Sequence, residues 1–296
     1  MRQSDGSNPE SLDACDDPHC PATGQDCSST GCWRECCRNR VLLSGVYDSV
    51  ATVGSVTEHG DFGLGTFTAL DGELILLDRI VHRAAVDGIV DVMPASTGTP
   101  FMAVTRFEPD QVLGVPTAQD YAAFQRWLED KLPSHNIFYA VQVEGVFSGI
   151  TYRSVPSQEK PYAPLGEVIA REQAVFEQKD IDGTLIGFWC PDFSEGVNVP
   201  GFHLHFLSAD RRHGGHVLDF NVIQATVGID ETNGWDIKLP TVADYLDADL
   251  SSDRSAELHA VEQGKGAAAA ESDRGDHGAV MDGECPGHPK RQIRMD

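Results

Sequence analysis

Residues 200–220 read Pro-Gly-Phe-His-Leu-His-Phe-Leu-Ser-Ala-Asp-Arg-Arg-His-Gly-Gly-His-Val-Leu-Asp-Phe. His203 and His205 stand two positions apart, with apolar residues between and beside them. Because successive side chains of a strand point to opposite faces, this alternation predicts a strand that presents both imidazoles on one face. Residues 208–215 are rich in Asp, Arg and Gly and predict a turn, after which a second strand brings His216 back beside the pair.

Three imidazoles on one β-hairpin predict a metal site. A neutral imidazole is a common zinc ligand, and three of them leave coordination open, as in catalytic rather than structural zinc sites. The alternative is that each histidine is an ordinary core or surface residue, which is the usual interpretation of a single histidine on a strand. The spacing of His203, His205 and His216 favours the metal site, whereas His213 lies in the predicted turn and is expected to be exposed.

The charge of the chain limits the class of partner. The 296 residues carry 22 Lys and Arg against 46 Asp and Glu, a formal net charge of −24. Such a surface repels nucleic acids and anionic membranes, so neither is an expected partner. Only six of the basic residues are Lys. This excess of carboxylates is the basis for a hypothesis of salt adaptation (a halophilic protein), because high salt screens their repulsion.

No stretch predicts insertion into a membrane or export. No run approaches about 18 consecutive apolar residues, and the first residues contain no apolar signal-peptide region. We therefore expect a cytoplasmic protein. Its length suits one large domain or two small ones, with enough chain to bury a substantial core.

The two ends of the chain differ in composition from the middle. Residues 1–40 are acidic and contain six of the eight cysteines, namely Cys15, Cys20, Cys27, Cys32, Cys36 and Cys37. Their spacing matches no paired Cys-x-x-Cys zinc motif, and structural disulfides are not expected without an export signal. We expect residues 1–40 to be a disordered extension, with metal binding as an open alternative, and residues 264–296 to be a low-complexity tail.

Between these ends the pattern predicts many short strands and few helices. Helical periodicity is clearest at residues 118–132, and short helices are expected at 164–171, 241–246 and 255–262. This predicts an α+β fold of mixed and antiparallel β-sheets, with the zinc site on a β-hairpin. We place an N-terminal sheet domain at residues 41–165 and a C-terminal zinc-binding domain at residues 166–263.

Several separated blocks resemble the alpha-acetolactate decarboxylase family and occur in the family's order. They are Gly-Asp-Phe-Gly-Leu-Gly-Thr-Phe (60–67), Leu-Asp-Gly-Glu (70–73), Arg-Ser-Val-Pro (153–156), Pro-Tyr (161–162), Gly-Phe (187–188), Gly-Phe-His-Leu-His-Phe (201–206), Asp-Arg (210–211) and Gly-Gly-His-Val-Leu-Asp-Phe (214–220). The resemblance runs from about residue 42 to residue 262 and leaves out both ends. It implies a zinc enzyme that converts the small molecule 2-acetolactate to acetoin and carbon dioxide. It also implies a homodimer of two-domain α/β subunits.

The resemblance implies roles for six residues. His203, His205 and His216 fall on the family's three zinc ligands, and Glu73 and Arg153 fall on its active-site glutamate and arginine.

The sixth residue is less distinctly marked. Glu262 corresponds to a second glutamate near the family's C-terminus, with Glu257, five residues earlier, as the alternative. In this interpretation zinc acts as Lewis acid and electron sink. Arg153 holds the departing carboxylate or stabilises the developing negative charge. Glu73 or Glu262 then delivers the final proton.

Two other interpretations remain open. The same three histidines would suit another metal-dependent lyase or hydrolase. A cupin, for example, would need a glutamate four or five residues after His205, where Ala209 and Asp210 stand. A non-catalytic metal-binding protein, for storage or sensing, would combine the hairpin with the Cys-rich extension. Removal of residues 1–40 distinguishes an enzyme from a metal sensor. An enzyme keeps its activity, whereas a sensor built on the extension loses its metal response.

Overall fold

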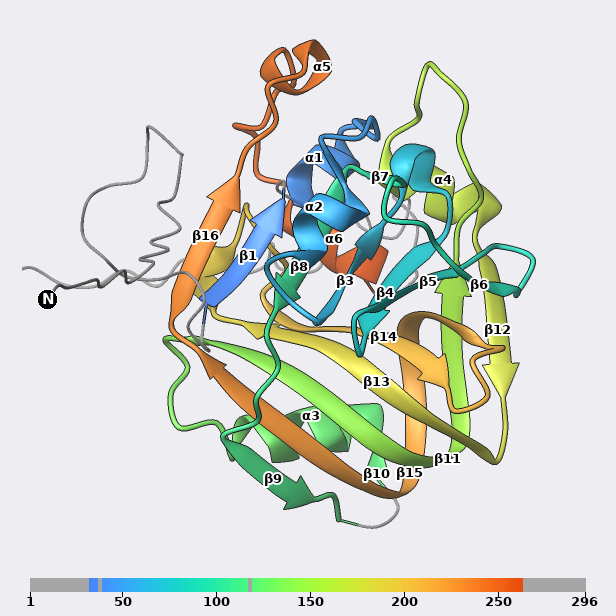
Figure 1. Cartoon of the computed structure of the whole chain (residues 1–296), viewed down its shortest axis with the longest axis vertical. Helices are drawn as coiled ribbons and strands as arrows, with labels where there is room; N and C mark the ends of the chain where they lie inside the picture. Colours follow the sequence, from blue (N-terminus) through green and yellow to red (C-terminus); the bar gives the residue numbers. More distant parts are fainter. Residues whose placement is uncertain (1–31, 37–38, 117–118, 263–296) are drawn as a thin grey trace, which may run out of the picture.

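The structure is a computed structural model that describes residues 32–36, 39–116 and 119–262 (Figure 1). In this part of the chain most strands belong to two seven-stranded sheets, with a separate pair formed by β2 (Ala51–Thr52) and β7 (Gly98–Thr99). Strand neighbours run antiparallel in both sheets, whereas β1 (Cys32–Cys36) runs parallel to β16 (Gly234–Lys238). The predicted α+β class with mixed and antiparallel sheets is confirmed.

The first sheet carries one of the predicted site residues at the start of a central strand. Glu73 begins β4 and pairs in register with Thr66, the last residue of β3. The strand order across the sheet is β16, β1, β8 (Phe101–Thr105), β3 (Phe62–Thr66), β4 (Glu73–Leu77), β5 (Ile80–Ala84) and β6 (Val90–Val92).

The second sheet carries the histidine hairpin. Its order is β10 (Gln119–Asp120), β15 (Gly214–Thr232), β14 (Gly201–Ser208), β13 (Ile181–Cys190), β11 (Phe138–Ser154) and β12 (Ala174–Gln178), with β9 (Gln111–Gly114) paired to β15. An additional pairing of β15 with β11 closes the path through β14 and β13 on itself. Register shifts along β11, at Val146, Phe147 and Thr151, mark bulges that bend this long strand.

The main core lies between the two sheets. It joins Leu64 and Ile75 of the first sheet to Ile186 and Phe188 of the second, all buried. On its other face the second sheet packs against α3 (Tyr121–Glu129) (Figure 1). The buried Phe124 of α3 makes a tilted ring contact with Phe202 of β14 and an edge-on contact with Phe220 of β15. The three histidines and Arg153 are thus carried by a sheet that is packed on both faces.

The helices in the described part of the chain are short. They are α1 (Asn39–Leu43), α2 (Val53–Thr57), α3, α4 (Leu165–Glu172), α5 (Ala243–Leu246) and α6 (Ser255–Glu262), with 3-10 turns at Thr68–Leu70 and Asp192–Ser194. Helix α3 is shorter than the predicted 118–132. Asp120 caps its N-terminus by accepting a hydrogen bond from the Ala123 N–H, and the helix ends at Glu129. None of these helices is long and apolar enough to cross a membrane.

Part of the predicted extension 1–40 is built into the fold. Residues 32–36 form β1, which fills the gap between β8 and β16 and joins them through backbone hydrogen bonds. This departs from the expectation of disorder for that segment, since the partner strands lie far along the chain. The other cysteines of the predicted extension (Cys15, Cys20, Cys27 and Cys37) and the tail 264–296 lie outside the described residues.

The predicted domain boundaries stay predictions. The sheets themselves do not divide between residues 165 and 166, because β11 pairs with β13 and β15, and β16 joins the first sheet. The long-range pairings therefore interleave the two predicted segments.

Candidate metal centre and active site

The predicted hairpin forms, and it gathers the three histidines. His205 and His216 are direct neighbours across the β14–β15 pairing, and His203 lies two residues before His205 on the same face. The turn is closed by the Ser208 N–H, which donates to the His213 carbonyl at 2.8 Å. One ligand atom from each of His203, His205 and His216 lies within 4.8 Å of the others, and all three residues are buried.

The environment keeps these imidazoles neutral. Burial lowers the pKa of His203 to about 3 and holds the pKa of His205 and His216 well below 6.5, and the Arg153 guanidinium acts in the same direction. His205 Nδ1 donates a hydrogen bond to the Leu74 carbonyl at 2.9 Å. The proton is therefore on Nδ1, and the lone pair of Nε2 can bind a metal ion. Neutral imidazoles with fixed orientation are the form that binds a metal ion.

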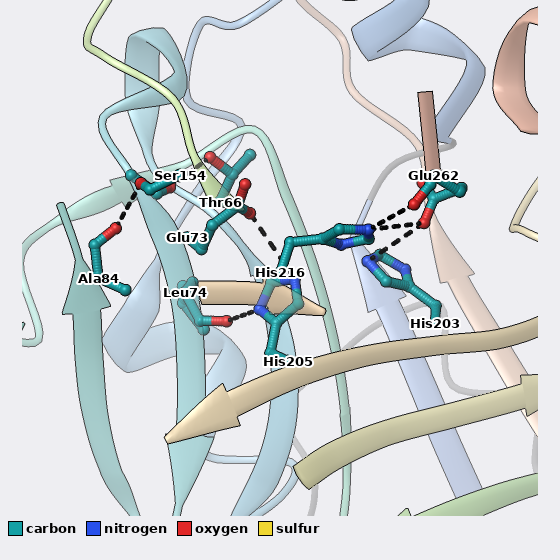
Figure 2. A network of polar contacts seen from close by, with 10 residues as sticks. Thr66, Glu73, Leu74, Ala84, Ser154, His203, His205, His216 and Glu262 are labelled. Atoms are coloured by element: carbon teal, nitrogen blue, oxygen red, sulfur yellow. Dashed lines mark hydrogen bonds and ion pairs between the residues drawn. The ribbon is translucent and has the colours of Figure 1, made fainter. Parts of the chain in front are cut away.

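Two buried atoms support a cation at this place. His203 Nδ1 and Glu262 Oε2 are buried and have no hydrogen-bond partner in the described part of the chain. Glu262 Oε2 lies 3.5 Å from His216 Nε2 and 3.8 Å from His203 Nε2, while Glu73 Oε2 lies 3.6 Å from His205 Nε2 (Figure 2). Neutral nitrogen donors flanked by carboxylates fit a divalent metal ion.

Glu73 and Glu262 reach the histidines from different elements. Glu73 is held by β4 of the first sheet, and Glu262 is the last residue of α6. Burial raises the pKa of each carboxyl group to about 7, and Arg153 opposes the shift in both. Groups with a pKa near neutrality exchange protons readily at physiological pH. The alternative residue Glu257 instead pairs with Arg254, at 2.8 Å.

Arg153 is a buried cation without a direct ion pair among the described residues. It pairs in register with His216 across β11 and β15, and it is only 4% exposed. Its Nε has no hydrogen-bond partner, and no ion pair joins it to another described residue. Since an unpaired buried charge is costly, the arrangement suits an anionic ligand.

Two cavities meet at the histidines. The inner one, of about 50 Å³, contains Glu73, Arg153, His203 and His205 and is otherwise largely apolar, with Leu42, Leu70, Phe101, Val155, Leu165 and Leu258. The outer one, of about 480 Å³, lies on the His216 side and contains the polar residues Tyr121, Gln125, Arg126, Glu129, Asp219 and His259.

Sequence reasoning did not single out Thr66 as a site residue. It lies in the inner cavity opposite Glu73, and its hydroxyl donates to the Gly72 carbonyl at 2.8 Å (Figure 2). Its place in the Gly-rich block 60–67, directly before the turn to Glu73, is the signal that was available. Asp219, three residues after His216, is exposed and accepts a hydrogen bond from the Phe220 N–H.

Comparison with known proteins gives matches to alpha-acetolactate decarboxylases. The family model for alpha-acetolactate decarboxylase matches residues 37–252. The alpha-acetolactate decarboxylase of Methylococcus capsulatus is 44% identical over 221 residues, covering 75% of this chain and 85% of that protein. That of Methanosarcina mazei is 41% identical over 222 residues, covering 75% and 77%. The crystal structure of the Bacillus subtilis alpha-acetolactate decarboxylase superposes with a TM-score of 0.76 at 34% identity, covering 79% of this chain and 99% of that one.

Proposed function

The chain belongs to the alpha-acetolactate decarboxylase family, which makes it a carboxy-lyase, and we propose that it converts 2-acetolactate to acetoin and carbon dioxide. The observation that carries the proposal is the unpaired, buried Arg153 beside three neutral histidines and two carboxyl groups. In this arrangement Arg153 can bind a carboxylate, the three histidines can bind a metal ion, and each of the two carboxyl groups can hold a proton. The family match supports this reaction over other metal-dependent lyases or hydrolases and over a non-catalytic metal protein.

We propose that His203, His205 and His216 hold zinc. When bound there, zinc supplies Lewis-acid chemistry and an electron sink for the pair of electrons that the departing carbon dioxide leaves behind. Glu262 and Glu73 lie next to this place, since each has an oxygen within 4 Å of a histidine Nε2. The apolar residues of the inner cavity keep water away from the reacting carbon.

Arg153 is proposed to bind the carboxylate of 2-acetolactate. A guanidinium presents two parallel N–H groups to a carboxylate, and the inner cavity brings this group close to His203 and His205. During the reaction the bond between the carboxylate carbon and the central carbon breaks. Its electron pair stays on the substrate while carbon dioxide leaves.

Glu73 or Glu262 is proposed to protonate the central carbon. With a pKa of about 7, either carboxyl group is partly protonated near neutral pH and can pass its proton to a carbon that has just lost carbon dioxide. Because both groups are fixed in the wall of one small cavity, the proton reaches one face of the substrate, and one acetoin enantiomer is expected.

A metal-content experiment tests the assignment of the ligands. Purified protein is expected to contain about one zinc per chain, and His205→Ala is expected to lose both the metal and the activity. His213→Ala is the matched control, because His213 lies outside the group of three. Wild-type affinity for zinc in the His205→Ala protein would contradict the assignment.

The remaining expectations belong to the same proposal. A homodimer and a split into two domains are supported by the family resemblance alone, and a cytoplasmic location and salt adaptation by the composition of the chain. The comparison of an enzyme with a sensor is best made by removing residues 1–31 rather than 1–40, because β1 begins at Cys32. An enzyme keeps its rate in that variant.

A further inference from the structure

Helix α6 forms the wall between the two cavities. Leu258 and Glu262 are four residues apart on one face of the helix, and both line the inner cavity. Glu262 also lines the outer cavity, and it is the one described residue common to both. Small shifts of α6 would therefore move Glu262 relative to His203 and His216.

Leu258 and Val261 pack α6 into the main core, and His216 Nε2 contacts the Glu262 carbonyl at its end. An arginine ties the start of the helix to the body of the protein. Arg254, directly before α6, donates from Nε and Nη2 to the two carboxylate oxygens of Glu257, both at 2.8 Å. The same guanidinium donates from Nη2 to the Leu43 carbonyl at 2.7 Å and from Nη1 to Ser44 Oγ at 2.9 Å. We call Arg254, Glu257, Leu43 and Ser44 the α6 tether.

The tether joins two elements that line the same cavity. Leu43 ends α1, and its neighbour Leu42 faces the inner cavity together with Leu258 of α6. The last carbonyl groups of a helix have no partner within the helix, and a cation there is favourable. The guanidinium thus binds the Leu43 carbonyl at the end of α1 and the Glu257 carboxylate of α6 at once. An ammonium group does not have the planar fork that meets both carboxylate oxygens.

We propose that Arg254 is a positioning residue, which through the α6 tether fixes Glu262 between the two cavities beside His203 and His216. Its kinetic consequence rests on the proposed function. In the Arg254→Met protein α6 is released from α1, so kcat for acetoin formation is expected to fall about tenfold to hundredfold. KM is expected to change less than about threefold, because Arg153, which binds the substrate carboxylate, is untouched.

Four variants separate the tether from general stability. Arg254→Lys keeps the positive charge but not the planar fork of the guanidinium, and its kcat is expected to lie between those of Arg254→Met and wild type. Ser44→Ala removes one hydrogen bond of the tether and is expected to lower kcat less than Arg254→Met does. Glu257→Gln leaves the bonds to α1 in place and weakens only the ion pair. Arg171→Met is the matched control, because Arg171 forms an exposed ion pair with Glu167 on α4.

Hydrogen–deuterium exchange measured by mass spectrometry tests the tether without activity. Amides of residues 258–262 are expected to exchange at least about tenfold faster in Arg254→Met than in wild type, while those of β14 keep their rate. Unchanged exchange in α6, or an equal rise in β14, would overturn the proposal whatever the reaction is. Absence of acetoin formation in wild type would instead overturn the proposed function, and the exchange result would still decide the tether. If exchange rises but kcat and KM stay as in wild type, Arg254 is not a positioning residue for the reaction.

Discussion

At the scale of single residues, Arg153 combines burial with the absence of a direct ion pair in the described part of the chain. A residue selected for stability would be paired, because an unpaired guanidinium in the interior is unfavourable. Its surroundings instead hold a cavity, three neutral histidines and two carboxyl groups that Arg153 influences electrostatically. A bound anion would pair with this guanidinium and offset the cost of burying it.

Replacement of Arg153 by methionine is expected to reduce kcat/KM about a hundredfold, because the substrate carboxylate loses a buried, charged partner. The thermal midpoint of the ligand-free protein is expected to stay the same or to rise, since an unpaired charge has been removed. Steady-state kinetics and thermal melting measure the two effects. Arg212→Met, at an exposed position in the hairpin turn, is the control. A large loss of stability with normal kinetics would assign Arg153 a structural role.

Glu73→Gln and Glu262→Gln identify the proton donor. An amide keeps the shape but cannot deliver the proton, so the residue that acts as donor is expected to lose about a hundredfold or more in kcat when replaced. Chiral chromatography of the product is expected to show a mixture of acetoin enantiomers in that variant. Glu177→Gln, on the exposed side of β12, serves as control. A Glu73→Gln protein with full rate and a single enantiomer would remove Glu73 from the role.

At the scale of elements, the close pairing of β13 with β14 holds two of the three histidines. Gly187 lies opposite Leu204, and a Cβ at Gly187 would come within 1.9 Å of the His203 carbonyl oxygen. The glycine is therefore required for the close approach of the two backbones rather than for a turn. The block Gly-Phe at 187–188 has a physical reason beyond its resemblance to the family.

The Gly187→Ala protein is expected to be destabilised by about 3 kcal/mol or more, since one of the two paired backbones has to move. Its zinc content is expected to fall together with its thermal midpoint, because His203 moves with the strand. Gly114→Ala is the control, as a Cβ there meets no atom within 4 Å. Equal melting temperatures for the two variants would show that the strands have more freedom than the structure indicates.

The local elements were more predictable than their partners. The alternation around His203 and His205 predicts β14 correctly, because a period of two is a property of the segment itself. Helix α6 coincides with the predicted 255–262. For α3 the periodicity located the helix but not its ends, since it begins after the Asp120 cap and ends at Glu129.

Properties that depend on distant parts of the chain were not predictable in this way. The inclusion of β1 in the first sheet depends on β16, about 200 residues later in the sequence. The burial of Glu73 and of Arg153 likewise follows from the packing of one sheet on the other. Thr66 was missed because a threonine before a turn carries no chemical signal until Glu73 is placed opposite it.

At the scale of the whole molecule, the net charge of −24 governs the response to salt. Repulsion between carboxylates is screened over about 3 Å at 1 M salt, so the thermal midpoint is expected to rise steadily between dilute buffer and molar sodium chloride. A neutral osmolyte at equal osmolality is the control, because it is excluded from the protein surface but does not screen charges. The highest stability in dilute buffer would refute salt adaptation.

The most direct test is the formation of acetoin from racemic 2-acetolactate in high-salt buffer, before and after removal of metal by a chelator. We predict that the untreated protein releases carbon dioxide and a single acetoin enantiomer, that the chelated protein is inactive, and that added zinc restores the rate. Full activity of protein shown to be free of metal, or no acetoin from protein with zinc bound at His203, His205 and His216, would contradict the proposed function.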